Sequence, residues 1–146
     1  MTIRTWIVAT FFLALSTAPW VSARAESGFK VIVSPASAVS SLSRDQVARL
    51  FLKKTLFWPN GAKVVPVEPP DASPARTAFS RSVLQKTMAE VAAYWQQQIF
   101  TGKAVPPTEV TTDAQVVRFV MGNPLGIGYV ADSAEVDGAK VLRITD

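Results

Sequence analysis

Short apolar runs alternate along the chain with segments that carry helix-start signals, and this alternation constrains the fold more than any other feature. The apolar runs are rich in β-branched residues and end at turn residues, which is typical of buried strands. The predicted strands are Phe29 to Val33, Lys63 to Val67, Gly126 to Val130 and Lys140 to Ile144, and the predicted helices open at Ser43, Ser73, Thr87 and Thr112. Strands that alternate with helices predict an α/β fold with helices on both faces of a small sheet.

Apolar residues inside the predicted helices repeat at the spacing of a single helical face. Val47, Leu50 and Phe51 form this face in the first helix, and the helix that follows Ser73 continues through Leu84. The inward residues expected of the two later helices are Met88, Val91, Ala92, Trp95 and Ile99, and then Val116, Val117, Val120 and Met121. We therefore expect each helix to pack inward through an apolar stripe.

Residues 1–25 have the features of a secretory signal peptide. Arg4 gives a positive start, Trp6 to Leu15 forms an apolar core, and Ala23-Arg24-Ala25 matches a cleavage site. The alternative is an uncleaved anchor, but the apolar core is shorter than the roughly 20 residues that span a bilayer. We predict cleavage of the leader, a periplasmic location, and one soluble domain of residues 26–146.

The chain contains no cysteine and no histidine. Their absence excludes disulfides, a lipid-modified cysteine, metal sites built on these residues and histidine-dependent catalytic triads. Asp132, Glu135 and Asp137 are more typical of an exposed loop than of a calcium site. The formal net charge of +4 falls to +2 without the leader, which carries Arg4 and Arg24. We expect a protein that is not an enzyme, has no cofactor or metal, and binds no nucleic acid.

The predicted helix start at Ser73 is the best candidate for a binding site. Helix N-termini present free N–H groups and a partial positive charge, and therefore attract anions. Ser73, with Arg76 and Thr77 one turn on, adds two hydroxyls and a guanidinium, which can bond two oxyanion oxygens at once. The alternative is that Ser73 caps its helix and Arg76 is solvated. Ser40 and Ser41 are further candidate ligands, or plain turn residues.

Several segments resemble, in the same order, those of the substrate-binding proteins of phosphate ABC transporters. They are Val31 to Pro35, Leu42 to Lys53, Trp58-Pro59-Asn60-Gly61, Val64 to Val67, Tyr94-Trp95, Phe100 to Lys103 and Gly126 to Val130. The resemblance implies a type II periplasmic-binding fold, in which two α/β lobes clamp an oxyanion. The chain has roughly half the expected length, so we expect a reduced version: a single three-layer α/β/α lobe with a small mixed sheet.

The chain departs from this family at the principal ligand loop. In the family, the strand that matches Val64 to Val67 leads into an Arg-x-x-x-Ser-Gly-Thr loop that binds phosphate. Here Glu68 stands near the place of the arginine, Ser73 resembles the serine, and Arg76 is the candidate substitute for the arginine.

Two functional hypotheses follow. In the first, the chain is an exported solute-binding module for phosphate or a similar oxyanion, acting in transport with an ABC permease or in sensing. In the second, it has lost ligand binding and is a periplasmic interaction or assembly module, with an apolar face that a partner protein or a second copy covers.

Overall fold

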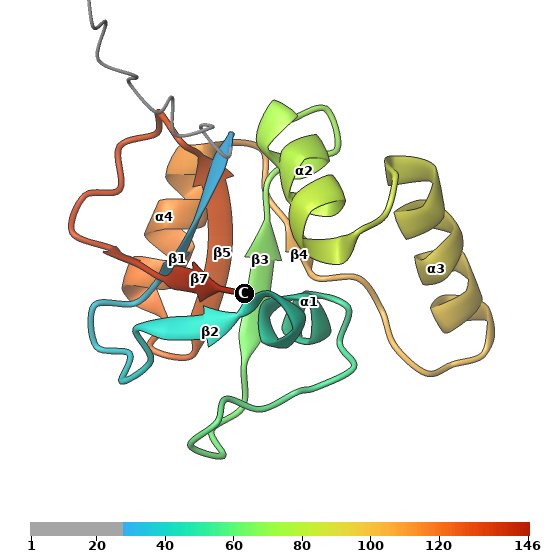
Figure 1. Cartoon of the computed structure of the whole chain (residues 1–146), viewed down its shortest axis with the longest axis horizontal. Coiled ribbons are helices and arrows are strands. Elements are labelled where there is room, and N and C mark those ends of the chain that lie inside the picture. Colours follow the sequence, from blue (N-terminus) through green and yellow to red (C-terminus); the bar gives the residue numbers. More distant parts are fainter. Residues whose placement is uncertain (1–27) are drawn as a thin grey trace, which may run out of the picture.

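The structure is a computed structural model that describes residues 28–146, so the predicted signal peptide lies outside the described residues. A mixed five-stranded sheet in the order β4-β3-β5-β1-β6 forms the middle layer (Figure 1). Its strands are β1 (Phe29–Val33), β3 (Val65–Glu68), β4 (Thr108–Glu109), β5 (Gly126–Ala131) and β6 (Lys140–Val141). A smaller parallel sheet joins β2 (Ser41–Ser43) to β7 (Arg143–Thr145).

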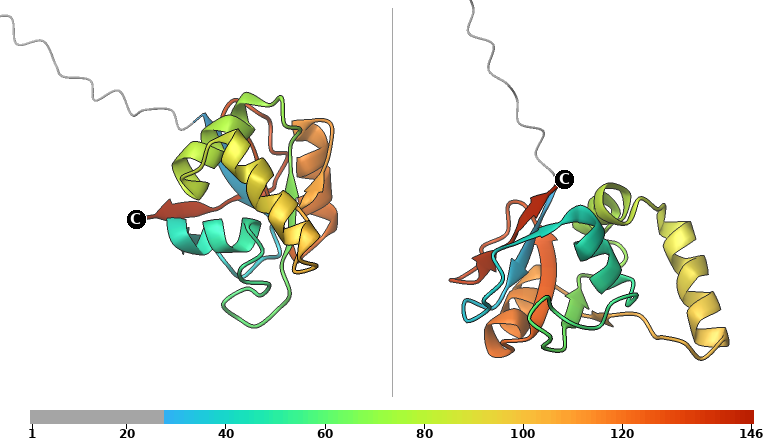
Figure 2. Two further views of the ribbon diagram at one scale, coloured as in Figure 1. Left: turned by 90° about the vertical axis from the view of Figure 1, so that its right-hand side faces the viewer. Right: turned by 60° about the horizontal axis from the view of Figure 1, so that its bottom comes forward.

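Helices cover both faces of the larger sheet. The first helix, α1 (Arg44–Phe51), shares one face with α2 (Pro74–Phe79) and the π-helix η1 (Ser80–Leu84), while α4 (Asp113–Gly122) covers the other (Figures 1 and 2). The predicted α/β fold, a three-layer lobe with a small mixed sheet, is confirmed.

The predicted helix starts are also confirmed, with one difference. Ser43, Thr87 and Thr112 are N-caps whose side chains accept from the backbone N–H three residues on. Ser73 is the N-cap of α2, but its side chain makes no capping hydrogen bond.

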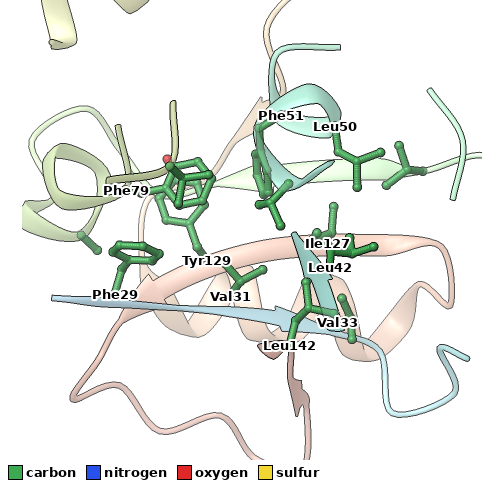
Figure 3. Packing of buried hydrophobic residues seen from close by; sticks show 14 of the residues in the cluster. Phe29, Val31, Val33, Leu42, Leu50, Phe51, Phe79, Ile127, Tyr129 and Leu142 are labelled. Carbon is green, nitrogen blue, oxygen red and sulfur yellow. The ribbon is translucent and has the colours of Figure 1, made fainter. Parts of the chain in front are cut away.

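The alternation of side chains along the strands divides the core between the two faces of the sheet. Val31 and Val33 pack on the side of α1 and α2, whereas Ile32 packs on the side of α4. Tyr129 and Val130 of β5 are divided in the same way. The rings of Phe29, Phe51, Phe79 and Tyr129 meet on the α2 side, where Phe79 stacks on Tyr129 with ring centroids 3.9 Å apart (Figure 3).

The predicted strand from Lys140 to Ile144 is two strands in the structure. The Leu142 N–H donates to the Val31 carbonyl oxygen at 2.8 Å, and the Arg143 N–H donates to the Ser40 carbonyl oxygen at 3.0 Å. The chain therefore changes partner at Leu142, from β1 to β2.

The remaining helix, α3 (Met88–Phe100), stands away from the sheet (Figures 1 and 2). Its predicted inward face is only partly right, because Val91 and Trp95 are buried but Ala92 is exposed and Ile99 is 54% exposed. Two hydrogen bonds link this region to the end of α1. The Tyr94 hydroxyl donates to the Leu52 carbonyl oxygen, and the Lys53 ammonium donates to the Pro106 carbonyl oxygen, at 2.7 and 3.2 Å.

The inward position predicted for Met121 is wrong, since this residue is 40% exposed near the end of α4.

Among residues 28–146, no helix has the length and apolar character needed to cross a membrane.

Candidate functional site

A cleft of 630 Å³ lies where α3 faces the ends of β3 and β4. One wall is apolar and comes mainly from α3, and the opposite side carries charged groups. The lining residues are Glu68, Asp71, Arg76, Met88, Val91, Ala92, Trp95, Pro106, Pro107 and Glu109. We refer to this feature as the α3 cleft.

Arg76 is the central charged group of the α3 cleft, and it is only 8% exposed. Its Nη1 donates to the Pro69 carbonyl oxygen at 2.8 Å and to Glu109 Oε2 at 2.7 Å. Its Nη2 lies 2.8 Å from Glu68 Oε1 and 2.9 Å from Asp71 Oδ1. The alternative that Arg76 is a solvated surface residue is therefore wrong, because the side chain is buried and joins three carboxylates.

The topology of the sheet explains why three carboxylates gather here. The parallel pairing of β3 with β4 sets Glu68 beside Glu109, and Asp71 follows β3 by three residues. Like charges on neighbouring strands repel each other. The Arg76 guanidinium offsets this repulsion by bonding to all three carboxylates at once.

Burial controls the protonation of the Glu68 carboxyl. It raises the pKa of Glu68 to about 7, against the opposing effects of the Arg76 charge and of the Tyr129 hydroxyl, which lies 3.4 Å from Glu68 Oε2. Burial lowers the pKa of Arg76, but the carboxylates, Glu68 above all, outweigh this effect and the net shift is upward. Burial and the Glu68 charge raise the pKa of Tyr129, which keeps its hydroxyl protonated.

The start of α2 has few backbone donors left for an anion. Pro74 has no N–H, and the N–H groups of Arg76 and Thr77 both donate to the Ser73 carbonyl oxygen, at 3.0 and 3.3 Å. Within the described part of the chain, Ala75 is the first-turn residue whose N–H makes no hydrogen bond.

Of the five residues predicted from the sequence to bind a ligand, only Arg76 lines the α3 cleft. Ser73 and Thr77 flank it along α2 without lining the cleft. Ser41 is exposed in β2, and the Ser40 hydroxyl lies 3.5 Å from the Lys140 ammonium, so neither serine lies in the cleft. The structure does not bring the five residues together.

Sequence reasoning missed Asp71 and Glu109 as residues of the cleft. It favours a core position for Trp95, which is 6% exposed and also lines the cleft. The sequence marks Glu68 only by its position near the place of the family's arginine. The signal for Glu109 is weak because β4 has two residues, too few for a strand pattern.

Comparison with solved structures shows which known proteins have a similar fold. A phosphate ABC transporter substrate-binding protein from Clostridium perfringens, crystallised with bound phosphate, superimposes with a TM-score of 0.63 at 22% identity over 80% of this chain and 44% of its own. The fold is that of phosphate substrate-binding proteins. No protein-family model and no curated protein sequence matches the chain.

Two further phosphate substrate-binding structures show the same likeness. An ABC-type phosphate transport receptor from Vibrio cholerae gives a TM-score of 0.58 at 17% identity, over 80% of this chain and 46% of its own. PstS from Borrelia burgdorferi gives 0.57 at 15% identity, over 82% of this chain and 47% of its own. The chain spans less than half the length of the structures it matches, which fits the expected reduced, single-lobe version of the phosphate substrate-binding fold.

Proposed function

We propose that this chain is an exported solute-binding module that takes up an oxyanion of the phosphate class in the α3 cleft. The observation that carries the proposal is the position of Arg76, a buried guanidinium at the cleft with two exposed carboxylates bonded to it. Asp71 and Glu109 have side chains that are 74% and 49% exposed. Their oxygens occupy places on the guanidinium that two oxygens of a tetrahedral anion would take.

Binding then proceeds by exchange of anions. Asp71 and Glu109 swing into solvent, where their exposed carboxylates are readily hydrated, and the oxygens of the entering anion replace theirs on the Arg76 guanidinium. Glu68 stays on Arg76 and keeps the guanidinium oriented toward the cleft. Ser73 and Thr77 are the candidate hydroxyl ligands from α2, whereas Ser40 and Ser41 have no part in this version of the site. We expect weak binding, because an anion in a single open lobe stays partly hydrated.

Calorimetric titration of the purified protein in phosphate-free buffer tests the proposal. Phosphate, sulfate and a simple organic phosphate are titrated separately. Saturable heat with one of them supports an oxyanion-binding module. Absence of heat up to millimolar ligand with all three contradicts it.

The site assignment needs a variant that still folds. Arg76→Ala alone leaves the Glu68 carboxyl buried without its partner, a change that typically costs about 3–5 kcal/mol. The double variant Glu68→Gln with Arg76→Gln removes the guanidinium without leaving this charge. We expect it to abolish oxyanion binding and to retain the far-UV circular dichroism spectrum of the wild type. Binding that survives in this variant places the ligand elsewhere.

Export belongs to the same proposal and has its own test. We expect the protein to be recovered from the periplasm with Glu26 as its first residue. N-terminal sequencing of the purified protein decides this, and an intact leader would favour the uncleaved anchor. A solute-binding module of this kind would deliver its ligand to an ABC permease or to a sensor.

A second candidate function, a periplasmic interaction or assembly module, is favoured by the apolar end of α3. Ile99, Phe100 and Val105 are 54%, 91% and 61% exposed and lie within seven residues of one another. Exposed apolar groups gathered in this way mark interaction sites more often than isolated ones do. A single species with the mass of one chain in light scattering would argue against self-association through this end.

A further inference from the structure

Two adjoining cavities outside the α3 cleft form one continuous groove. They measure 650 and 620 Å³ and share Arg44, Val83, Gln85 and Asp146. The groove runs between α1 and η1 and continues past β7 to the start of β1. No residue lines both this groove and the α3 cleft. We call it the basic groove.

The charge of the basic groove gives it its name. Three acidic side chains line it, Asp45, Asp132 and Asp146, against twice as many basic ones. The basic residues are Lys30, Arg44, Arg49, Lys54, Arg81 and Lys86. Elsewhere in residues 28–146 the acidic and basic side chains are equal in number. The whole positive surplus of the described chain is therefore concentrated in this groove.

Most of the basic side chains in the groove are available for a partner. Arg44 pairs with Asp146, and Arg49 pairs with Asp45 at 2.8 Å. The other four make no ion pair within the described part of the chain; they are Lys30, Lys54, Arg81 and Lys86. Positively charged groups held near one another repel and favour an anionic occupant.

The walls of the groove also contain apolar side chains between the charges. Leu84 lies beside Lys86 in the first cavity, and Val141, which is 50% exposed, lies in the second. The Asp146 carboxylate on Arg44, where the two cavities meet, shows how a carboxylate is bound there. An occupant that matches these features carries several carboxylates with aliphatic side chains between them.

We propose that the basic groove binds an acidic, extended segment of a partner protein. A concave channel two cavities long follows an extended chain better than it follows the flat surface of a membrane. The charged contacts would set partner choice and association rate, and the aliphatic contacts would add buried apolar area. This inference is independent of the oxyanion site and holds for either function considered above.

Fluorescence anisotropy with a labelled peptide of repeated Glu-Ser-Glu-Leu units tests the inference. We expect saturable binding to the purified protein that weakens as salt is raised, because salt screens charges beyond a Debye length of about 10 Å at 0.1 M. The double variant Lys54→Glu with Lys86→Glu should weaken binding about tenfold. The matched control, Lys63→Glu with Lys103→Glu, makes the same change of net charge at exposed lysines outside the groove and should bind like the wild type.

Several outcomes would overturn the inference. Equal weakening in the groove and control variants would mean that only net charge matters. Equal binding of a peptide with Gln in place of Glu would show that the negative charge of the peptide is not needed for binding. Displacement of the peptide by millimolar phosphate at constant ionic strength would indicate a small-anion site. Recruitment to phosphatidylglycerol vesicles through Lys54 and Lys86, with no peptide binding, would identify a lipid surface as the occupant.

Discussion

Glu68 and Arg76 form a buried ion pair, with Oε1 of the glutamate 2.8 Å from Nη2 of the arginine and both side chains 9% exposed. β3 ends at the glutamate, and α2 supplies the arginine eight residues later. Replacing a buried pair by uncharged groups is often neutral or stabilising, whereas removing one partner is costly. The pair links the end of β3 to α2 at the edge of the α3 cleft.

Stability should depend on pH through Glu68. Its pKa is raised to about 7 in the folded protein, above the ordinary value that it has when unfolded. Between these two values the folded state holds a proton that the unfolded state lacks, so stability falls as pH rises through about 7 and levels off above it. The expected loss between about pH 4.5 and pH 7 is on the order of 2–3 kcal/mol. Urea unfolding measured across this range checks the slope.

Glu68→Gln tests whether Glu68 causes this dependence of the free energy of unfolding on pH. The amide does not titrate, so the variant should lose this part of the pH dependence and be more stable than the wild type at pH 8. Arg76 keeps the carboxylates of Asp71 and Glu109 in the variant. An unchanged slope would assign the pH dependence to other groups.

Removing the two exposed carboxylates should strengthen oxyanion binding. In Asp71→Asn with Glu109→Gln, Arg76 loses two competing anions and the cleft loses two negative charges. We expect phosphate affinity to rise about tenfold, which corresponds to about 1.4 kcal/mol. Calorimetry gives the comparison, and Asp132→Asn with Glu135→Gln is the control, since both lie on an exposed loop outside the cleft.

Comparing the wild type with the Asp71→Asn, Glu109→Gln variant tests two claims separately: that the native protein binds an oxyanion, and that these two carboxylates compete with it. Binding by the double variant but not by the wild type would mean that the native carboxylates block the site and that the proposed function fails. Binding by the wild type with no gain in the double variant would mean that Asp71 and Glu109 do not compete with the ligand.

Local sequence signals predicted the layers of the fold well. The strand at Phe29 to Val33 and the capping residues Ser43, Thr87 and Thr112 are where the patterns placed them. These features depend on side-chain period and on hydrogen bonds within one turn, and both are visible in a single sequence.

The site was harder to predict because its contacts are not local. Glu109 meets Arg76 across 33 positions of the chain, through a strand of two residues. Burial of Arg76 likewise follows from the path of the chain after β3 and not from the pattern of α2. The exposure of Ile99 reflects the separation of α3 from the sheet, which helical periodicity does not encode.

Gly128 should be required for the packing of α4 on the sheet. A Cβ at this position would lie 2.5 Å from Val116 Cγ1 and 2.9 Å from Val67 Cγ1. Val116 is β-branched and helical, so its side chain has little freedom to move aside. We expect Gly128→Ala to destabilise the protein by about 1–3 kcal/mol in thermal or urea unfolding.

Gly122→Ala is the control for this prediction. Gly122 lies at the end of α4, and a Cβ there would meet nothing within 4 Å. Alanine favours the helix over glycine by up to about 1 kcal/mol, so this variant should be neutral or slightly more stable. Equal effects of the two substitutions would mean that the contact with Val116 does not limit the packing.

Phe100 and Trp95 lie on the same helix but should differ in their effect on stability. Phe100 is 91% exposed and Trp95 is 6% exposed. We expect Phe100→Ser to change the free energy of unfolding by less than about 0.5 kcal/mol, and Trp95→Ala to cost about 3 kcal/mol. Urea unfolding measures both. If the apolar end of α3 is an interface between copies, Phe100→Ser should also lower the mass seen by light scattering to that of one chain. A wild-type protein that already has this mass would leave Phe100 without a role in self-association.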